Sequence, residues 1–114
     1  MATVNPTRLF ASRNLVLGYE WVLTESDTAV EVEMPWNSDK SIQVSGDFGS
    51  GGDVRLGGSL DPARTTFADL RDPQGNLIQI TSADLVAVME NAFYIRPRVA
   101  AGTGVSVTVR VLAR

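Results

Sequence analysis

Residues 46–60 read GDFGSGGDVRLGGSL, which places six glycines in fifteen positions. A P-loop needs a Lys directly after its last glycine, and no Lys follows these glycines. A dinucleotide-binding turn opens a helix, whereas Val54 and Leu56 continue here in the alternating pattern of a strand. Glycine tolerates positive φ angles, so we interpret residues 49–52 as a hairpin turn between two strands. Gly57 and Gly58 indicate a bulge or a close backbone approach.

Outward from this stretch, apolar and polar residues alternate with a period of two along most of the chain. Turn-forming residues such as those in Asp72-Pro-Gln-Gly-Asn76 separate the alternating segments. About eight short strands at this spacing are typical of a β-sandwich of the jelly-roll type. The alternation predicts a core that includes Trp21, Val32, Val44, Phe48, Ile95, Val107 and Val109.

One segment departs from the alternation. Residues 81–90 read TSADLVAVME, with Leu85, Val88 and Met89 at the i, i+3 and i+4 positions of a helical face. Thr81 or Ser82 precedes them as a candidate N-cap. The pattern predicts one short helix that covers an end of the sandwich, and a partner-binding amphipathic helix is the alternative.

The N-terminal residues show neither the two-residue period of a strand nor the period of a helix. Within residues 1–13, the apolar residues Val4, Pro6, Leu9 and Phe10 follow no strand or helix pattern. We therefore expect an extended N-terminal arm over residues 1–13 and a single β-sandwich domain over residues 14–114. The arm either clamps onto a neighbouring subunit or folds back on its own domain.

The composition excludes several classes of chemistry. The chain of 114 residues has no cysteine and no histidine, which removes disulfides, thiolate nucleophiles, Ser–His pairs and imidazole-bound metals. Glu31 and Glu33 are spaced like a carboxylate pair, but a solvated strand face explains them better than a hydrolase site. Asp47, Asp53 and Asp61 do not form a calcium-binding pattern. We expect no enzyme activity, no cofactor, no metal and no small-molecule substrate.

The charge pattern concerns partners. A net charge of −3 argues against nucleic-acid binding, and no apolar run is long enough to cross a membrane. Nine of the ten cationic residues are Arg, with Lys40 as the exception. Arginine suits protein interfaces because its planar fork pairs with carboxylates, although a compositional bias of the genome gives the same count.

A resemblance to a known family begins at Ser41 and extends to Leu112, about two-thirds of the chain. The order SIQVSGDFGSGGDVRLGGSLD, then LRDPQGNLIQITSADLVAVMENAFYIRPRVAAGTGVSVTVRVLA, resembles small virion proteins of tailed bacteriophages. Those proteins share the glycine-flanked strand, the D-PQGN turn, a short helix, the YIRP strand and a final valine-rich strand. The chain departs from them at residues 61–67, DPARTTF, where a D-G-x-x-W turn is common in the family.

The resemblance implies a capsid decoration, or cement, protein that binds the outside of the head shell and stabilises it. The implied partners are the major capsid protein and further copies of the chain, as a homotrimer. The implied location is the capsid exterior, after synthesis in the bacterial cytoplasm. A tail or head–tail connector component is the alternative within viruses, and a carbohydrate-binding or adhesin-like module is the alternative outside them. Candidate partner-binding residues are Val4, Pro6, Leu9, Phe10 and Trp36.

Overall fold

A computed structural model of the chain describes residues 2–9, 16–34 and 39–114. These residues form strands and turns without a helix, so the described fold is all-β. The strands are β1 (Thr3–Val4), β2 (Thr7–Leu9), β3 (Leu17–Leu23), β4 (Thr28–Ala29), β5 (Val32–Glu33), β6 (Lys40–Asp47), β7 (Ser50–Ser59), β8 (Ala68–Asp69), β9 (Gln79–Ile80), β10 (Asp84–Val88), β11 (Tyr94–Thr103) and β12 (Ser106–Ala113).

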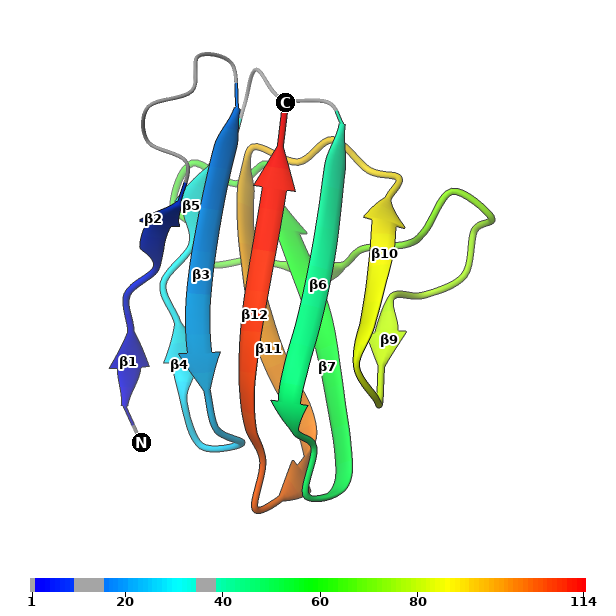
Figure 1. Cartoon of the computed structure of the whole chain (residues 1–114). Helices are drawn as coiled ribbons and strands as arrows, with labels where there is room; N and C mark the ends of the chain where they lie inside the picture. Colours follow the sequence, from blue (N-terminus) through cyan, green and yellow to red (C-terminus); the bar gives the residue numbers. More distant parts are fainter. Residues whose placement is uncertain (1, 10–15, 35–38) are drawn as a thin grey trace.

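Two five-stranded sheets lie one behind the other (Figure 1). The front sheet has the order β10-β6-β12-β3-β2, and its neighbouring strands are all antiparallel. The back sheet has the order β5-β11-β7-β8, and β9 also pairs with β7. The short strands β1 and β4 form a separate parallel pair. The long strands β6, β12, β7 and β11 therefore form the centre of both layers.

The core lies between these sheets. Along β12, Val107, Val109 and Val111 are buried and alternate with residues that face solvent or lie half-buried. The back sheet contributes Val54, Leu56 and Ile95 among other side chains to the same cluster. Of the expected core residues, Trp21, Val32, Val44, Ile95, Val107 and Val109 are buried, which confirms the alternation, while Phe48 is only half-buried at the edge of the core.

Two turns carry the chain from one sheet to the other at the same end of the molecule. Residues 48–49 connect β6 to β7, and residues 104–105 connect β11 to β12 (Figure 1, lower end). Because β6 pairs with β12 and β7 pairs with β11, these two corner turns run side by side. A single antiparallel ribbon therefore bends from the front sheet into the back sheet.

Glycine makes this bend possible. Gly49 has a φ of 56°, and a Cβ atom placed on it would lie 2.1 Å from the carbonyl oxygen of Thr103. Gly102 has a φ of 127°, and its Cβ would lie 2.8 Å from the Cα of Gly52. No side chain fits at these distances, so glycine is required both in the corner turn at residue 49 and where β11 meets β7 beside the turns.

The glycine-rich stretch is therefore a turn, as expected, but the expected hairpin is wrong. β6 pairs with β10 and β12, whereas β7 pairs with β11, β8 and β9, so the two strands flanking the turn lie in different sheets. The expected bulge or close backbone approach at Gly57 and Gly58 is not seen: the strand register is regular there, and a Cβ on Gly58 would instead lie 2.7 Å from the side-chain atom Leu70 Cδ2.

The expected short helix at residues 81–90 is also wrong. Residues 84–88 form the edge strand β10, which pairs with β6 from Asp84–Val44 to Val88–Lys40. Val88 is buried and Val86 half-buried, whereas Leu85 points outward with 63% of its surface exposed. The β-branched residues at alternate positions favour a strand, and pairing with β6 decides between the two patterns.

The described part of the N-terminal segment pairs with strands of its own chain. β1 pairs with β4, and β2 pairs with β3 through Thr7–Glu20 and Leu9–Gly18. The expectation that Val4 and Leu9 join no strand is therefore wrong, because sheet pairing requires no long sequence period when the strands are this short. The boundary at residue 13 lies outside the described residues, so the division into arm and domain stays a prediction.

The corner turns give a stability prediction with a matched control. Gly49 and Gly51 are both exposed and have positive φ values of 56° and 70°, but a Cβ on Gly51 has nothing within 4 Å. Gly51→Ala should lower the free energy of unfolding by about 1 kcal/mol from backbone strain alone. Gly49→Ala adds the collision with Thr103 and should cost about 1–3 kcal/mol more.

Urea unfolding followed by tryptophan fluorescence measures both variants. Equal losses for Gly49→Ala and Gly51→Ala would contradict the close approach of the two corner turns.

Candidate interaction surfaces

The outer face of the front sheet carries a row of leucines. Successive side chains of a strand point to opposite faces, so the residues between the buried valines of β12 face outward. Leu112 is one of them, and it lies opposite Gly18 of β3, which in turn lies opposite Leu9 of β2. Because Gly18 has no side chain, Leu9 and Leu112 line the same hollow across it.

This hollow has a volume of about 280 Å³ and also includes Leu85 of β10. A second hollow of about 450 Å³ adjoins it, since both include Ser41 and Leu112. Ala87 and Met89 line the second hollow, and Met89 is 61% exposed. We call the surface formed by Leu9, Leu85, Ala87, Met89 and Leu112 the leucine face.

An ion pair lies at one end of the leucine face, in the same cross-strand row as Leu85. Arg110 of β12 lies opposite Glu20 of β3, and the Arg110 Nε donates to Glu20 Oε2 at 2.6 Å. Arg110 also lines the hollow with Leu85. Apolar area bordered by polar groups is the usual anatomy of a protein interface.

The structure brings together only part of the expected partner-binding set. Leu9 belongs to the leucine face. Val4 is half-buried and packs against the core of its own chain, and Pro6 is half-buried between β1 and β2. Phe10 and Trp36 lie outside the described residues. Sequence reasoning missed Leu85 and Met89 as sheet-surface residues because it placed them on a helix.

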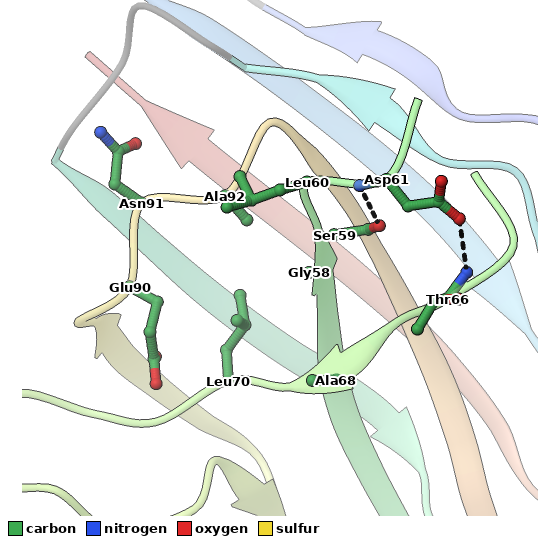
Figure 2. Close-up of a pocket in the computed structure, with 10 residues that line it drawn as sticks. All are labelled: Gly58, Ser59, Leu60, Asp61, Thr66, Ala68, Leu70, Glu90, Asn91 and Ala92. Carbon is green, nitrogen blue, oxygen red and sulfur yellow. Dashed lines mark hydrogen bonds between the residues drawn. The ribbon is translucent and has the colours of Figure 1, made fainter. Parts of the chain in front are cut away.

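A larger hollow lies between the end of β7 and residues 90–92, with a volume of about 540 Å³ (Figure 2). Leu60, Leu70 and Ala92 provide apolar surface around it, and Leu60 is 76% exposed. The polar side chains in its wall accept bonds from within the chain: Glu90 Oε1 from the Arg71 N–H, and Asn91 Oδ1 from Lys40 Nζ. The hollow therefore offers mainly apolar contact.

Asp61 organises the loop at one side of this hollow. Its Oδ1 accepts the N–H of Ala63, and its Oδ2 accepts the hydroxyl and N–H of Thr65 and the N–H of Thr66. The Thr65 hydroxyl, followed by the backbone N–H groups, holds the pKa of Asp61 below its ordinary value. Arg64, in this loop, has a positive φ of 59°. One carboxylate thus closes a loop of strained backbone.

The outer face of the back sheet is rich in arginine. The guanidinium of Arg64 lies 4.6 Å from the centre of the Tyr94 ring, and that of Arg96 lies 4.0 Å from the centre of the Phe67 ring. Asp69 binds both Arg98 and Arg55. Hydrogen bonding from Arg98, and then from Arg55, holds the pKa of Asp69 below its ordinary value. The excess of Arg over Lys in the sequence was the signal that pointed to such contacts.

The other candidate clusters have simpler roles. Glu31 and Glu33 both contact Arg64, at 3.4 and 2.9 Å, and so tie β5 to the loop of Asp61. Within residues 2–9, 16–34 and 39–114, no three acidic side chains are placed to hold a metal ion. In the same ranges, no helix has the length and apolar character needed to cross a bilayer.

The loop of Asp61 gives the second prediction. Asp61 accepts the Ala63 amide on Oδ1 and the Thr65 and Thr66 amides on Oδ2, whereas Asn supplies only one acceptor oxygen, so Asp61→Asn should speed hydrogen exchange at one of these two sets. Asp72→Asn is the matched control, because Gln74 and Asn76 both donate to Asp72 Oδ1 alone. In Asp72→Asn, the Gln74 and Asn76 amides should keep their protection from exchange.

The pH dependence of this loop follows from the lowered pKa of Asp61. A depressed folded-state pKa contributes order that is present above the ordinary carboxyl pKa and is lost as the pH falls through the lowered value. The protection of the Thr65 and Thr66 amides, measured against their intrinsic exchange rate at each pH, should therefore fall in that acidic range. Unchanged protection, both in acid and in Asp61→Asn, would show that the Arg64 contacts hold the loop instead.

No protein-family model, no curated protein and no solved structure matches the chain. The leucine face and the arginine-rich outer face of the back sheet are therefore identified from the geometry of this chain alone.

Proposed function

We propose that the chain is a structural protein of a tailed-bacteriophage virion that decorates the outside of the capsid and stabilises the shell. We infer that its two layers form a β-sandwich of the jelly-roll type. The proposal includes the major capsid protein as partner and self-association as a homotrimer. The leucine face is the observation that supports an assembly role most directly, and the resemblance at residues 41–112 supports the virion context.

Exposed leucines on a sheet face are costly in water and favourable in an interface. Leu85 and Met89 each keep more than half of their surface exposed, and Leu112 keeps 37%. Transfer of one such side chain out of water contributes about 1.5–3 kcal/mol. A contiguous exposed apolar patch on a soluble chain is a common sign of a protein-binding surface.

The leucine face lies on a regular sheet, and this suits binding to a rigid lattice. β6 and β12 pair over eight residue positions beneath it, so the leucines are held at fixed spacing. A rigid surface loses little conformational entropy on binding. In a homotrimer, three such faces would act together, so a modest contact per subunit would give firm attachment.

The remaining candidates for capsid contact are Val4, Pro6, Phe10 and Trp36, and they stay predictions. The β2–β3 pairing places Leu9, the neighbour of Phe10 in sequence, on the leucine face. Within this proposal, the N-terminal segment therefore contributes to attachment as part of the sheet surface.

The location is tested on virus particles purified from the bacterium that produces the chain. Electron cryo-microscopy should show added density of this size on the outer surface of the head, in a symmetric array. Density confined to the tail or to the head–tail junction would replace the decoration role by a connector role. Absence of the chain from the particles would overturn the proposal.

The binding surface is tested with substitutions. Leu85→Asp should reduce co-sedimentation with capsids that lack the protein by about tenfold or more, since it removes the burial of one leucine and adds a charge that must be desolvated. Leu60→Asp is the control, because Leu60 is more exposed than Leu85 but lies on the hollow of Figure 2.

Both variants should keep the circular dichroism spectrum of the wild-type chain, because both side chains are on the surface. Equal attachment of Leu85→Asp and the wild-type chain would exclude the leucine face as the capsid contact. A loss confined to Leu60→Asp would move the contact to the hollow beside Asp61.

A further inference from the structure

A polar hollow of about 290 Å³ lies on the outer face of the back sheet, away from the leucine face. Phe67, Arg96 and Arg98 line it, together with Gly57, Thr65 and Asp69. Arg96 and Arg98 lie two residues apart on β11 and so point to the same face of the sheet. Two guanidinium groups therefore border one open space.

Arg96 is held in place without using its hydrogen-bond donors. Its guanidinium carbon lies 4.0 Å from the centre of the Phe67 ring, which fixes the plane of the group. Gly57 is its partner across the strand pair, and a Cβ there would lie 3.6 Å from the Cβ of Phe67. Within the described residues, the Arg96 guanidinium has this stacking contact and no hydrogen bond or ion pair.

Arg98 is oriented by Asp69, and part of its guanidinium does not bond to that carboxylate. Its Nε donates to Asp69 Oδ1 at 3.3 Å, and its Nη2 donates to Asp69 Oδ2 at 2.9 Å. These bonds use one edge of the guanidinium. The other edge, formed by Nη1 and the second N–H of Nη2, is not used by Asp69.

The charges around the hollow leave room for one anion. Arg96 and Arg98 line the hollow with two positive charges and Asp69 with one negative charge, and the neighbouring ion pair of Arg55 with Asp53 adds no net charge. The hollow therefore carries an excess of one positive charge, opposite in sign to the net charge of −3 of the whole chain. A single carboxylate would neutralise it, whereas a phosphate dianion would leave excess negative charge beside Asp69.

We propose that this hollow binds the carboxylate of an Asp or Glu side chain on an exposed segment of a partner protein. Arg96 supplies the paired N–H donors over the Phe67 ring, and the free edge of Arg98 supplies a second contact. Stacked arginines with unused donors are typical anchors of protein interfaces. Tyr94 is the next residue of β11 on this face, and Arg64 of the Asp61 loop stacks on it, so the surface extends beyond a small-molecule site.

The proposal is tested on the whole chain by NMR titration with two capped pentapeptides. One has a single central Glu between Gly and Ser residues, and the other has Gln at that position. The Glu peptide should shift the guanidinium Nε–H signal of Arg96 and the amide signals of Gly57 and Thr65, and the Gln peptide should not. Acetate and inorganic phosphate at matched ionic strength are the comparison ligands, and both should bind more weakly than the Glu peptide.

Variants locate the site. Arg96→Gln should weaken binding of the Glu peptide about tenfold, the usual effect of losing a charge-assisted hydrogen bond. Arg8→Gln removes an equal charge from an exposed position on β2 of the front sheet and should leave binding unchanged. The wild-type titration stands by itself if Arg96→Gln fails to fold.

Each alternative outcome overturns the proposal. Equal binding of the Glu and Gln peptides would show that the carboxylate is not recognised. Tighter binding of phosphate would show a general anion site, and equal binding of acetate would show that no protein segment is needed. Equal weakening in Arg8→Gln and Arg96→Gln would reduce the effect to net charge.

Discussion

The close contact between the two corner turns is the constraint on which the rest of the structure depends. The carbonyl oxygen of Thr103 occupies the space where a side chain of residue 49 would begin, and the backbone of Gly52 does the same for residue 102. This contact lets one antiparallel ribbon, β6 with β12, continue as β7 with β11 in the other sheet. The two layers are thereby fixed relative to each other, and their valine-rich inner faces meet as a single core.

Much of the strand content could be predicted from the sequence, because alternation of apolar residues reports directly on a face that is buried. The valines of β12 are the clearest case, since each buried residue is followed by an exposed or half-buried one. The sheet that each strand joins could not be predicted in the same way. The glycines at residues 49–52 indicate a turn, but a hairpin and a crossing between sheets need the same positive φ angles, and only pairing with distant strands separates them.

The segment at residues 84–88 shows a second limit of local patterns. Leu85, Val88 and Met89 fit a helical face, while Val86 and Val88 fit a strand face. Burial of Val88 against the core and pairing with β6 select the strand, and this choice leaves Leu85 and Met89 on the surface. The same structural event that contradicts the helix therefore creates part of the leucine face. The stacking of Arg96 on Phe67 likewise depends on tertiary contacts, since the two residues are far apart in sequence.

The two outer faces differ in chemistry, although the centre of both sheets is formed by one continuous ribbon. The front sheet presents leucines beside one ion pair, and the back sheet presents arginines stacked on aromatic rings. Salt does not screen apolar burial, and some salts strengthen it, whereas contacts made by surface charges weaken as the ionic strength rises. A partner on one face and a partner on the other would thus respond to different solution conditions.

The position of β12 has a consequence for synthesis of the protein. β12 lies between β6 and β3 in the front sheet and pairs with residues up to 96 positions earlier, as the Ala113–Leu17 pair shows. The front sheet is therefore incomplete until the ribosome has translated residues 106–113. Before that point, β3 and β6 each present an unpaired edge next to apolar side chains, a state that is prone to aggregation. A ribosome that stalls before residue 106 would thus release a fragment for chaperones and proteases, because the missing strand is the one that joins the two halves of the sheet.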